Sequence, residues 1–474
     1  MTAALFGNAD QGVFVDCLFA SHRRPGLCCP VAQMPRKTAC DGLKGVYSRN
    51  IRMDQRDDHR PIVSPMAAPS QIQDARGAAA ESKGWSQGLL SSSMVGSTNR
   101  GRVLQALFDL GPTSRADLAR YAGVNRTTIS GIVQPLIDDD LLVEGGPVPG
   151  ASGVGKPARP LWFSANARPI CGVLLMPSFV HACIVTLEGK IEADHRLALP
   201  DGSGPNGPIV DTILEAAAQT LAGARRPPLG IGVAVGGMVD TGAGAVVKIN
   251  LAPALDGYPL AATLERRFGL PAKLDHHPRA LLVGDRWFGA GRNVRQFAVV
   301  YTGEVLGGAL YVDGHLFRGT AGAGGELGHT FVQLDGELCR CGRRGCWDTI
   351  ATLSWLRREA ARIGLPDPQS IDSQRLVASL DLPGAPELVD RYARNVAVGI
   401  ANLQQTVAPN VFILHGDVVL GGPYLLEAIA SHVRAMVPSR PGSVIEIIAG
   451  DAGDRAALLG AAGLVLSDLL QFEI

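Results

Sequence analysis

The chain has 474 residues, more than a single hydrophobic core usually holds, so two or three domains are expected. Its 44 lysines and arginines balance 44 aspartates and glutamates, which excludes a global electrostatic field as the cause of binding to nucleic acid or to an anionic membrane. Any DNA binding must therefore come from a local surface.

The most apolar stretch is 170–187, but Pro177, Ser178 and His181 interrupt it. It fits two strands and a turn better than a membrane span. No basic residue precedes the short apolar patch near the N-terminus, which makes it a poor secretory signal. The nine cysteines are odd in number, and three of them sit in a cluster of the metal-binding type. We expect a cytoplasmic protein without a membrane partner.

Residues 1–95 mix Pro, Gly, Ser and Arg without the sustained period of a helix or a strand. We expect a disordered extension or an upstream artefact of the chosen start, in which case Met94 is an alternative beginning. Its four cysteines, Cys17, Cys28, Cys29 and Cys40, are expected to be free thiols without a role.

The segment 96–165 begins with three predicted helices. Apolar residues within 103–108 share one helical face, and a Gly-Pro pair ends that helix. Ser114 caps a second helix, and Asn125 caps a third that runs to about residue 137 after a tight Gly-containing turn. Helix, short turn and helix are typical of a helix-turn-helix.

Two strand-like segments, 141–144 and 161–163, follow the third helix and flank a loop that carries Lys156 and Arg159. Two strands around a basic loop form a wing. The whole segment is therefore predicted to be a winged helix-turn-helix domain that binds DNA.

In such a domain the start of the second helix of the motif enters the major groove. We expect it to read a double-stranded DNA operator through Asn125, Arg126, Thr127, Thr128, Ser130 and Gln134. Arg126 suits bidentate pairing with guanine, while Lys156 and Arg159 hold the backbone or an adjacent minor groove. Seven basic against six acidic residues between 96 and 160 leave the domain nearly neutral, so a three-helix packing module with solvated polar faces is the alternative.

Beyond residue 168, alternating strands and helices predict an α/β body. The strand candidates are 170–176, 180–187, 229–235, 297–301 and 308–312, and the last is followed by the hairpin signal Asp313-Gly314. The helical candidates include 211–222, 260–268, 388–407 and 456–470. Two similar runs indicate two lobes, which we place at 168–290 and 291–474, with the C-terminal helix as a candidate for return to the first lobe.

A metal-type constellation lies in the second of these lobes. His329, Cys339, Cys341 and Cys346 form H-x9-C-x-C-x4-C. Three thiolates and one imidazole fill a tetrahedral site without an open position, which is typical of structural zinc. Cys171 and Cys183 lie on predicted strands and are expected in the core.

Around this constellation, Gly325-Glu-Leu-Gly-His329 and Cys339-Arg-Cys-Gly-Arg-Arg-Gly-Cys346-Trp-Asp348 resemble the signature of the ROK family (repressors, open reading frames and kinases), E-x-G-H and then C-x-C-G-x-x-G-C-x-E. Residues 286–292 and 314–319 are also similar to that family, and Gly-Lys-Pro-Ala at 155–158 resembles the wing of its regulators. The resemblance covers roughly residue 96 to the end. It implies an actin-like, sugar-kinase-like (ribonuclease H-like) body whose two lobes hold a ligand between them.

The kinase members of that family need cradles for the phosphates of ATP and a carboxylate base. This chain departs at four places. Residues 175–179 lack the Asp and Gly of Asp-x-Gly-x-Thr, and His276 and His277 replace the Asn-Asp pair. The second phosphate loop reads Gly-Glu-Val at 303–305, where a carboxylate would repel a triphosphate. The late Gly-Gly loop reads Leu-His-Gly-Asp at 414–417. We expect no enzymatic activity, since His277 as a base would lack phosphate cradles.

The resemblance also implies a set of ligand-binding residues, and these are Asn250, His276, His277, Glu326, His329 and Asp348. Asn250, Glu326, His329 and Asp348 resemble the family's sugar contacts. Buried hydrogen-bonding groups of this kind suit a polyol. Two readings stay open: a sugar or sugar-phosphate effector, or a vestigial pocket in which Glu326 and His329 serve only the metal loop.

The sequence therefore predicts a transcriptional regulator, a repressor whose lobes close on an effector and reset the spacing of two winged helices. We expect a homodimer or a dimer of dimers. The alternative is a sugar kinase, which phosphorylates a hexose or amino sugar with ATP and carries an accessory N-terminal domain. Regulation by a protein partner is a third hypothesis.

Overall fold

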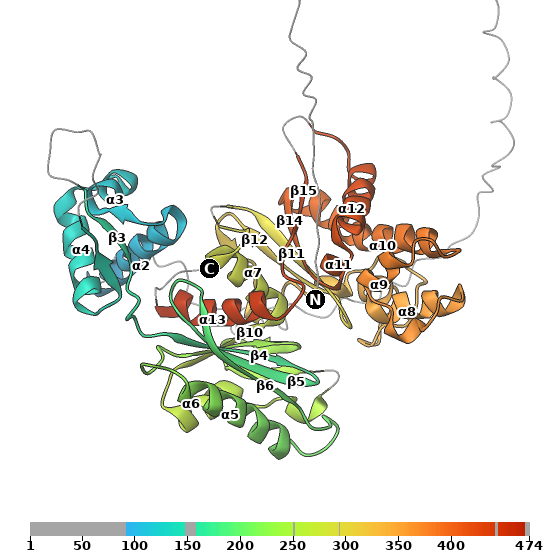
Figure 1. Ribbon diagram of the computed structural model, residues 1–474, viewed down its shortest axis with the longest axis horizontal. Coiled ribbons are helices and arrows are strands. Elements are labelled where there is room, and N and C mark those ends of the chain that lie inside the picture. The colour runs from blue at the N-terminus through green and yellow to red at the C-terminus, as the bar shows by residue number, and fades with distance from the viewer. Residues whose placement is uncertain (1–91, 147–157, 250–251, 293, 441–443, 470–474) are drawn as a thin grey trace, which may run out of the picture. The chain divides into compact units, whose positions relative to one another are not determined.

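The computed structural model describes residues 92–146, 158–249, 252–292, 294–440 and 444–469 (Figure 1). Most of the predicted extension 1–95 lies outside these ranges, and so do Lys156 and Asn250. Within the described ranges, no helix is both long enough and apolar enough to cross a bilayer.

The elements within residues 92–146 and 158–163 are described together and are called the helical module. It contains α2 (Ser92–Leu110), β1 (Thr113–Ser114), α3 (Arg115–Ala122), α4 (Arg126–Asp138), β2 (Leu142–Glu144) and β3 (Pro160–Phe163). The three strands pair antiparallel in the order β1-β3-β2. As predicted, the side chain of Ser114 accepts the N–H of Asp117 at the start of α3, and that of Asn125 accepts the N–H of Thr128 at the start of α4. These caps satisfy backbone donors that a helix leaves unpaired.

The first sheet of the body has the order β10-β7-β4-β5-β6. Its strands are β4 (Ile170–Met176), β5 (Phe179–Val185), β6 (Ile191–Ala198), β7 (Ile231–Val235) and β10 (Ala272–His276). The helices α5 (Gly207–Ala222) and α6 (Leu260–Phe268) cover one face, and α13 (Arg455–Leu469) packs on the other (Figure 1). A small hairpin of β8 (Met238–Asp240) and β9 (Ala245–Lys248) adjoins β10. Cys171 and Cys183 are fully buried core residues, as predicted.

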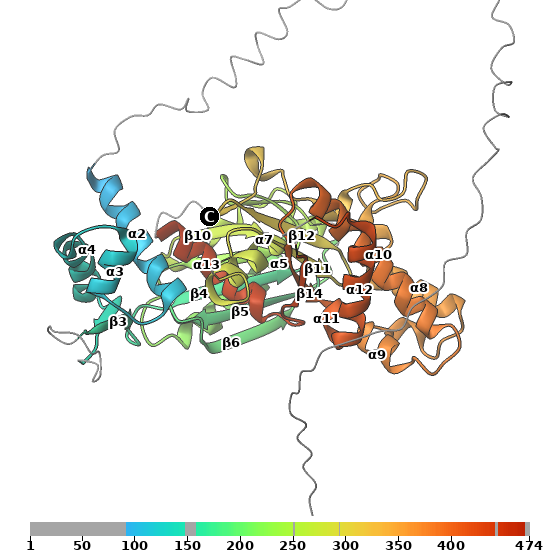
Figure 2. The same cartoon turned by 90° about the horizontal axis from the view of Figure 1, so that it is seen from above.

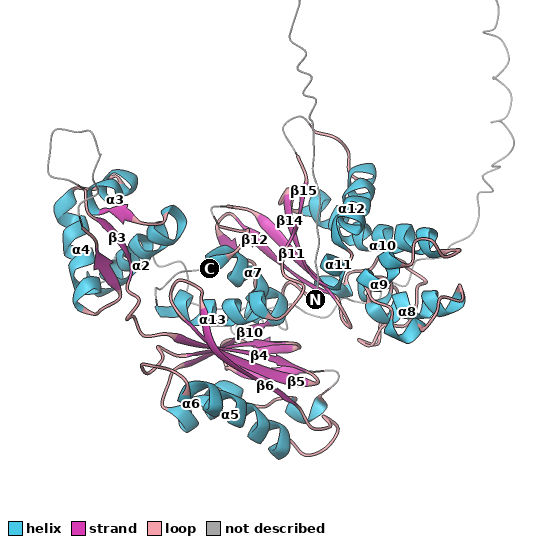
Figure 3. Ribbon diagram, viewed as in Figure 1, coloured by secondary structure: helices cyan, strands magenta, loops and turns pink. Residues whose placement is uncertain are grey.

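The second sheet has the order β13-β12-β11-β14-β15. Its strands are β11 (Phe297–Thr302), β12 (Gly307–Val312), β13 (His315–Leu316), β14 (Val411–Gly416) and β15 (Glu446–Ala449), all drawn in magenta in Figure 3. Asp313 and Gly314 have positive φ angles of 53° and 86°, so the predicted tight hairpin is confirmed.

Five helices accompany the second sheet: α8 (Leu353–Arg362), α9 (Ser373–Ala378), α10 (Ala385–Thr406), α11 (Asp417–Leu420) and α12 (Gly422–Met436). The helices α10 and α12 run side by side (Figure 2). Their buried residues form one hydrophobic cluster with residues of β11, β12 and β14.

A further helix, α7 (His277–Phe288), follows β10 directly and lies against α13. A Cβ atom on Gly460 would lie 1.8 Å from the carbonyl oxygen of Ala280, so the two backbones are in direct contact. Ten of the twelve residues of α7 are buried. Three of these ten, His277, Arg279 and Asp285, are polar, so the buried positions do not follow the apolar period by which helices are predicted, and the sequence did not indicate this helix.

Candidate functional site

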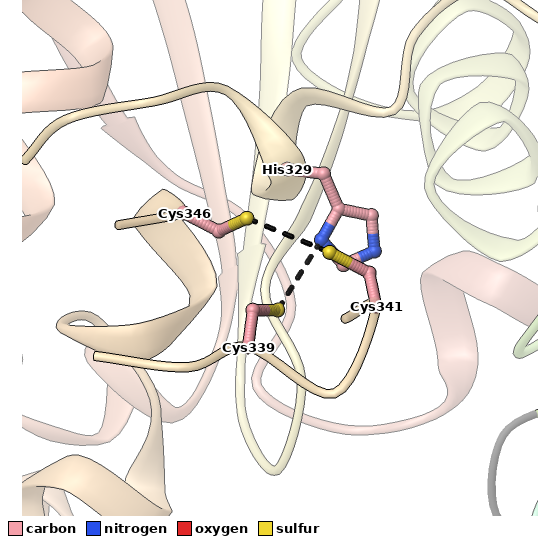
Figure 4. A group of neighbouring side chains, drawn as sticks. All are labelled: His329, Cys339, Cys341 and Cys346. Carbon is pink, nitrogen blue, oxygen red and sulfur yellow. Dashed lines mark hydrogen bonds between the residues drawn. The ribbon is translucent and has the colours of Figure 1, made fainter. Parts of the chain in front are cut away.

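Four predicted metal ligands come together in the second half of the body (Figure 4). One ligand atom from each of His329, Cys339, Cys341 and Cys346 lies within 4.8 Å of the others. The sulfur atoms of Cys341 and Cys346 are 3.6 Å apart, as are the sulfur of Cys339 and Nδ1 of His329. A zinc tetrahedron with Zn–S bonds of about 2.3 Å has edges of about 3.8 Å, so this donor set fits structural zinc.

Glycines allow the loop to fold back on itself. Gly345 has a φ of 72°, and a Cβ atom there would lie 1.5 Å from the carbonyl oxygen of Gln333. Gly342 has a φ of 83° and follows Cys341 in a tight turn. The backbone N–H of Cys339 donates to the carbonyl of Arg343 at 2.7 Å. A side chain at Gly345 would therefore clash with the backbone, and Gly342 has a φ that other residues rarely adopt.

The thiols of this cluster differ in acidity. Burial raises the pKa of the Cys346 thiol to about 12. Burial also acts on Cys341, but hydrogen bonds from the backbone and guanidinium of Arg343 outweigh it and lower the pKa to about 7. Because a metal binds thiolates, Cys341 is the cysteine most ready to ligate at neutral pH.

A cavity of about 100 Å³ lies beside the cluster, between the ends of the first-sheet strands and the start of β12. Five of the six predicted ligand-binding residues line it, namely His276, His277, Glu326, His329 and Asp348. The sixth, Asn250, lies outside the described residues. Residues remote in sequence are therefore gathered at one cavity, and Lys248, Tyr301 and Arg340 line it as well.

The two histidines that replace the Asn-Asp pair are neutral. Burial, followed by the charge of Arg279, lowers the pKa of His276 to about 3. Burial, followed by the charge of His415, lowers the pKa of His277 to about 4. A neutral imidazole both donates and accepts a hydrogen bond, which suits hydroxyl groups. The pKa of His277 is close to the ordinary aspartate value of about 3.9, so acidity alone does not distinguish it from the base it replaces.

A buried ion pair that the sequence did not indicate lies next to the histidines. Nε of Arg279 is 2.7 Å from Oδ1 of Asp275, and both side chains are 2% exposed. Arg279 also donates to the carbonyls of Gly322 at 2.8 Å and Gly324 at 3.3 Å. The pair thereby holds the loop that leads to Glu326. Only spatial proximity could reveal this role, since the loop is more than forty residues away along the chain.

Asp348 and His329 each connect the metal cluster with the cavity. Oδ1 of Asp348 accepts the backbone N–H of Leu306 at 2.8 Å, and its Oδ2 lies 3.9 Å from the sulfur of Cys339. His329 turns Nδ1 to the cluster, which leaves Nε2 as the nitrogen for a ligand (Figure 4). The two predicted roles of His329 are therefore compatible.

Two of the family's nucleotide-binding positions contain polar groups that bind within the protein. Glu304 pairs with Arg357 at 2.6 Å, so its negative charge is compensated and repels a triphosphate less than the sequence alone indicated. Asp417 is buried, accepts the N–H of Ser373 at 3.0 Å and the hydroxyl of Tyr392 at 3.2 Å, and takes the place of the late Gly-Gly loop.

At the start of α4, the residues from Asn125 to Thr128 are all exposed. Oδ1 of Asn125 accepts both the backbone N–H and the hydroxyl of Thr128, at 2.8 and 2.9 Å. Ser130 is half-buried and Arg159 is exposed. Gln134 accepts from Arg115 at 3.2 Å and donates to Asp138 at 2.9 Å, so its amide is already engaged. Lys156 lies outside the described residues.

Comparison with known proteins gives the following matches. Residues 178–468 match the ROK family. The xylose repressor of Bacillus spizizenii is 26% identical over 393 residues, covering 81% of this chain and 98% of the repressor. The glucokinase of Streptomyces coelicolor is 29% identical over 315 residues, covering 62% of this chain and 96% of the kinase. A crystal structure of a ROK family transcriptional regulator, a homologue of the E. coli MLC protein, aligns with a TM-score of 0.67 at 23% identity, over 80% of this chain and 99% of that one.

Proposed function

The chain belongs to the ROK family, and from this we propose that it is a DNA-binding transcriptional repressor of the ROK type, responsive to a sugar and without kinase activity. The observation that carries the proposal is the pair of neutral histidines, His276 and His277, at the place where the family's kinases have their base. The loss of the aspartate that serves the kinases as base supports a sensor rather than a phosphotransferase.

The helical module would be the DNA reader. Its order of three helices and three strands supports a winged helix-turn-helix, in which α4 would be the recognition helix. The repressor match covers 81% of the chain and the glucokinase match only 62%, which supports a part that regulators have and kinases lack. Arg126, Thr127 and Thr128 would meet bases and phosphates, and Lys156 and Arg159 would grip the backbone from the wing.

The cavity would bind a sugar or sugar phosphate. Glu326, Asp348 and the neutral histidines offer acceptors and donors for adjacent hydroxyls. Lys248 and Arg340 are cations on the same cavity, which suits a phosphate group on the ligand. The relatives named as xylose repressor and glucokinase both carry sugar names, which supports this ligand class.

Zinc would be held by His329, Cys339, Cys341 and Cys346, and it would supply a cross-link that stiffens this loop rather than a reactive centre. We propose a homodimer or a dimer of dimers in the cytoplasm. Two recognition helices related by a two-fold axis match the symmetry of a palindromic operator.

The test is a fluorescence anisotropy titration of the purified protein with palindromic DNA from its own promoter, repeated at several salt concentrations. Binding that weakens steeply with salt is expected, because phosphate contacts release counterions. A coupled ATP assay with hexoses and amino sugars runs in parallel, and no turnover is expected. Absent DNA binding would refute the repressor, and hexose-dependent ATP consumption would favour the kinase.

A further inference from the structure

A shielded ion pair joins the helical module to the body. Asp109 at the end of α2 receives two bonds from Arg286 near the end of α7: Nη1 to Oδ1 at 2.9 Å and Nη2 to Oδ2 at 3.3 Å. Both side chains are only 12% exposed. Two parallel N–H···O bonds fix orientation as well as distance. The ends of the two helices are therefore held as one unit.

Aromatic rings pack beside this ion pair. The ring of Phe108 lies edge-on to Trp287, with centroids 4.8 Å apart, and to Phe288 at 5.9 Å. The indole of Trp287 is 1% exposed and donates to the hydroxyl of Ser467 on α13 at 3.1 Å. Close-packed rings transmit a displacement rather than absorb it.

The other end of α7 lies at the sugar cavity. His277 and Pro278, its first two residues, line the cavity, and so does Gly307, the first residue of β12. A Cβ atom on Gly307 would lie 2.6 Å from Cγ of Pro278. The helix and the strand therefore touch where a ligand would sit.

Both α7 and β12 connect the cavity with Arg286. The helix reaches it directly, and β12 reaches it through Tyr311, whose hydroxyl accepts Nε of Arg286 at 3.2 Å. The helix cannot easily bend on the way, because its backbone at Gly284 is pressed against Gly460 of α13. A tightly packed helix responds to a ligand by shifting as a body.

We propose that Arg286 is the positioning residue through which the state of the sugar cavity reaches the DNA-reading module. This inference rests on the proposed function of both sites. A ligand that separates or draws together Pro278 and Gly307 shifts α7 against β12. Arg286, bound to both and to Asp109, then shifts the end of α2 and with it the module.

The test uses a steric wedge in place of a ligand, so that the effector need not be known. Gly307→Ala adds the methyl group that meets Pro278. Operator affinity is measured for the native chain, Gly307→Ala, Asp109→Asn and the double variant. We expect the wedge to change the operator Kd at least about fivefold in the native background and to have no effect in the Asp109→Asn background.

A matched control is available in the same module. Asp140 forms an ion pair with Arg226 of the body at 3.4 Å, with side chains 60% and 43% exposed. Asp140 has a positive φ of 59°, a conformation that Asn tolerates. The wedge should therefore keep its full effect in an Asp140→Asn background. An equal wedge effect in the Asp109→Asn and Asp140→Asn backgrounds, or no wedge effect in any background, would overturn the proposal.

A second variant covers the case in which the Gly307→Ala protein does not fold. Tyr311→Phe removes only the hydroxyl that Arg286 contacts, and it should shift the operator Kd in the native and Asp140→Asn backgrounds but not in Asp109→Asn. Hydrogen exchange of Phe108, Asp109 and Leu110 is followed in the same proteins without DNA. If the chain binds no operator, the repressor assignment fails. The coupling is then judged from hydrogen exchange alone. Exchange rates that respond to the variants only when Asp109 is present support the coupling, and rates that do not respond in this way overturn it.

Discussion

Asp348 accepts the backbone N–H of Leu306 at 2.8 Å across 42 residues of sequence. Asp348 follows the last metal ligand, Cys346, by two residues, and Leu306 is part of the cavity wall. A hydrogen bond to the Asp348 carboxylate thus joins the metal loop to the wall of the cavity. Loss of the metal cluster should therefore alter the position of Leu306 at the cavity.

Replacing a metal ligand should therefore unfold the loop and weaken ligand binding together. For Cys341→Ser we expect loss of bound zinc and a fall in the free energy of unfolding on the order of 3 kcal/mol, because a hydroxyl does not replace a thiolate ligand. Zinc content and urea denaturation, with and without a chelator, measure this. The matched control Cys183→Ala removes a core thiol and should keep its zinc. A Cys341→Ser protein with stoichiometric zinc would contradict the assignment.

Arg126→Ala should lower operator affinity by about 1–3 kcal/mol, because it removes a cation from the start of α4. Fluorescence anisotropy with the palindromic operator checks this, and the salt dependence of Kd should become shallower. Arg434→Ala is the control, since Arg434 pairs with Glu427 on α12, outside the helical module. Equal losses in both variants would indicate a general effect of charge rather than contact with DNA.

The buried histidines should make the free energy of unfolding depend on pH. The pKa of His277 is about 4 in the fold and about 6.5 in the unfolded chain, so its contribution is fully present above pH 6.5. As the pH falls from 6.5 towards 4, only the unfolded chain takes the proton, and the free energy of unfolding drops by roughly 1.4 kcal/mol per pH unit. Urea denaturation between pH 4.5 and 7.5 should show a shallower fall for His277→Gln.

His181 provides the opposite sign as a control. Its hydrogen bond to Asp454 raises its pKa, so its contribution is present below pH 6.5 and is lost as the pH rises through the folded value. His181→Gln should therefore lose stability most at low pH, which makes the acid-dependent fall steeper. Parallel curves for His181→Gln and His277→Gln would show that neither histidine titrates as described.

The contact between α7 and α13 should tolerate no methyl group at Gly460. Gly460→Ala places Cβ against the backbone of Ala280, which cannot move alone, and about 3 kcal/mol or more of stability should be lost. At Gly463 the nearest atoms belong to the side chains of Val283 and Trp287, at 2.7 and 3.0 Å, so Gly463→Ala should cost roughly 1 kcal/mol. Thermal unfolding of both variants gives the ranking, and a reversed order would contradict it.

Local signals predicted several elements well. The apolar run 170–176 is the strand β4, the amphipathic run 260–268 is α6, and Asp313-Gly314 forms the hairpin, each within the bounds expected. The metal ligands were recognisable because four residues close in sequence must meet within a few ångströms. Helix caps at Ser114 and Asn125 are equally local.

Features that depend on distant partners were missed. The strand β6 carries charged residues at three of its four exposed positions and only half-buried residues between them, so it lacks an apolar run. The ion pair of Asp109 and Arg286 joins residues 177 positions apart, and no local pattern contains it. Arg279 was not singled out from the sequence, although it is buried against Asp275. Tertiary packing decides these cases, and propensity does not.

The bond between Glu304 and Arg357 bears on how such a protein can evolve. Restoring the Gly-Thr-Gly loop of a kinase at 303–305 would remove the carboxylate and leave Arg357, whose side chain is 25% exposed, without that partner. Because the Glu304 side chain is 57% exposed, a reversion at Glu304 alone should lower the free energy of unfolding by at most about 1 kcal/mol. A loop rebuilt to bind a phosphate would therefore also need a new partner for the Arg357 guanidinium.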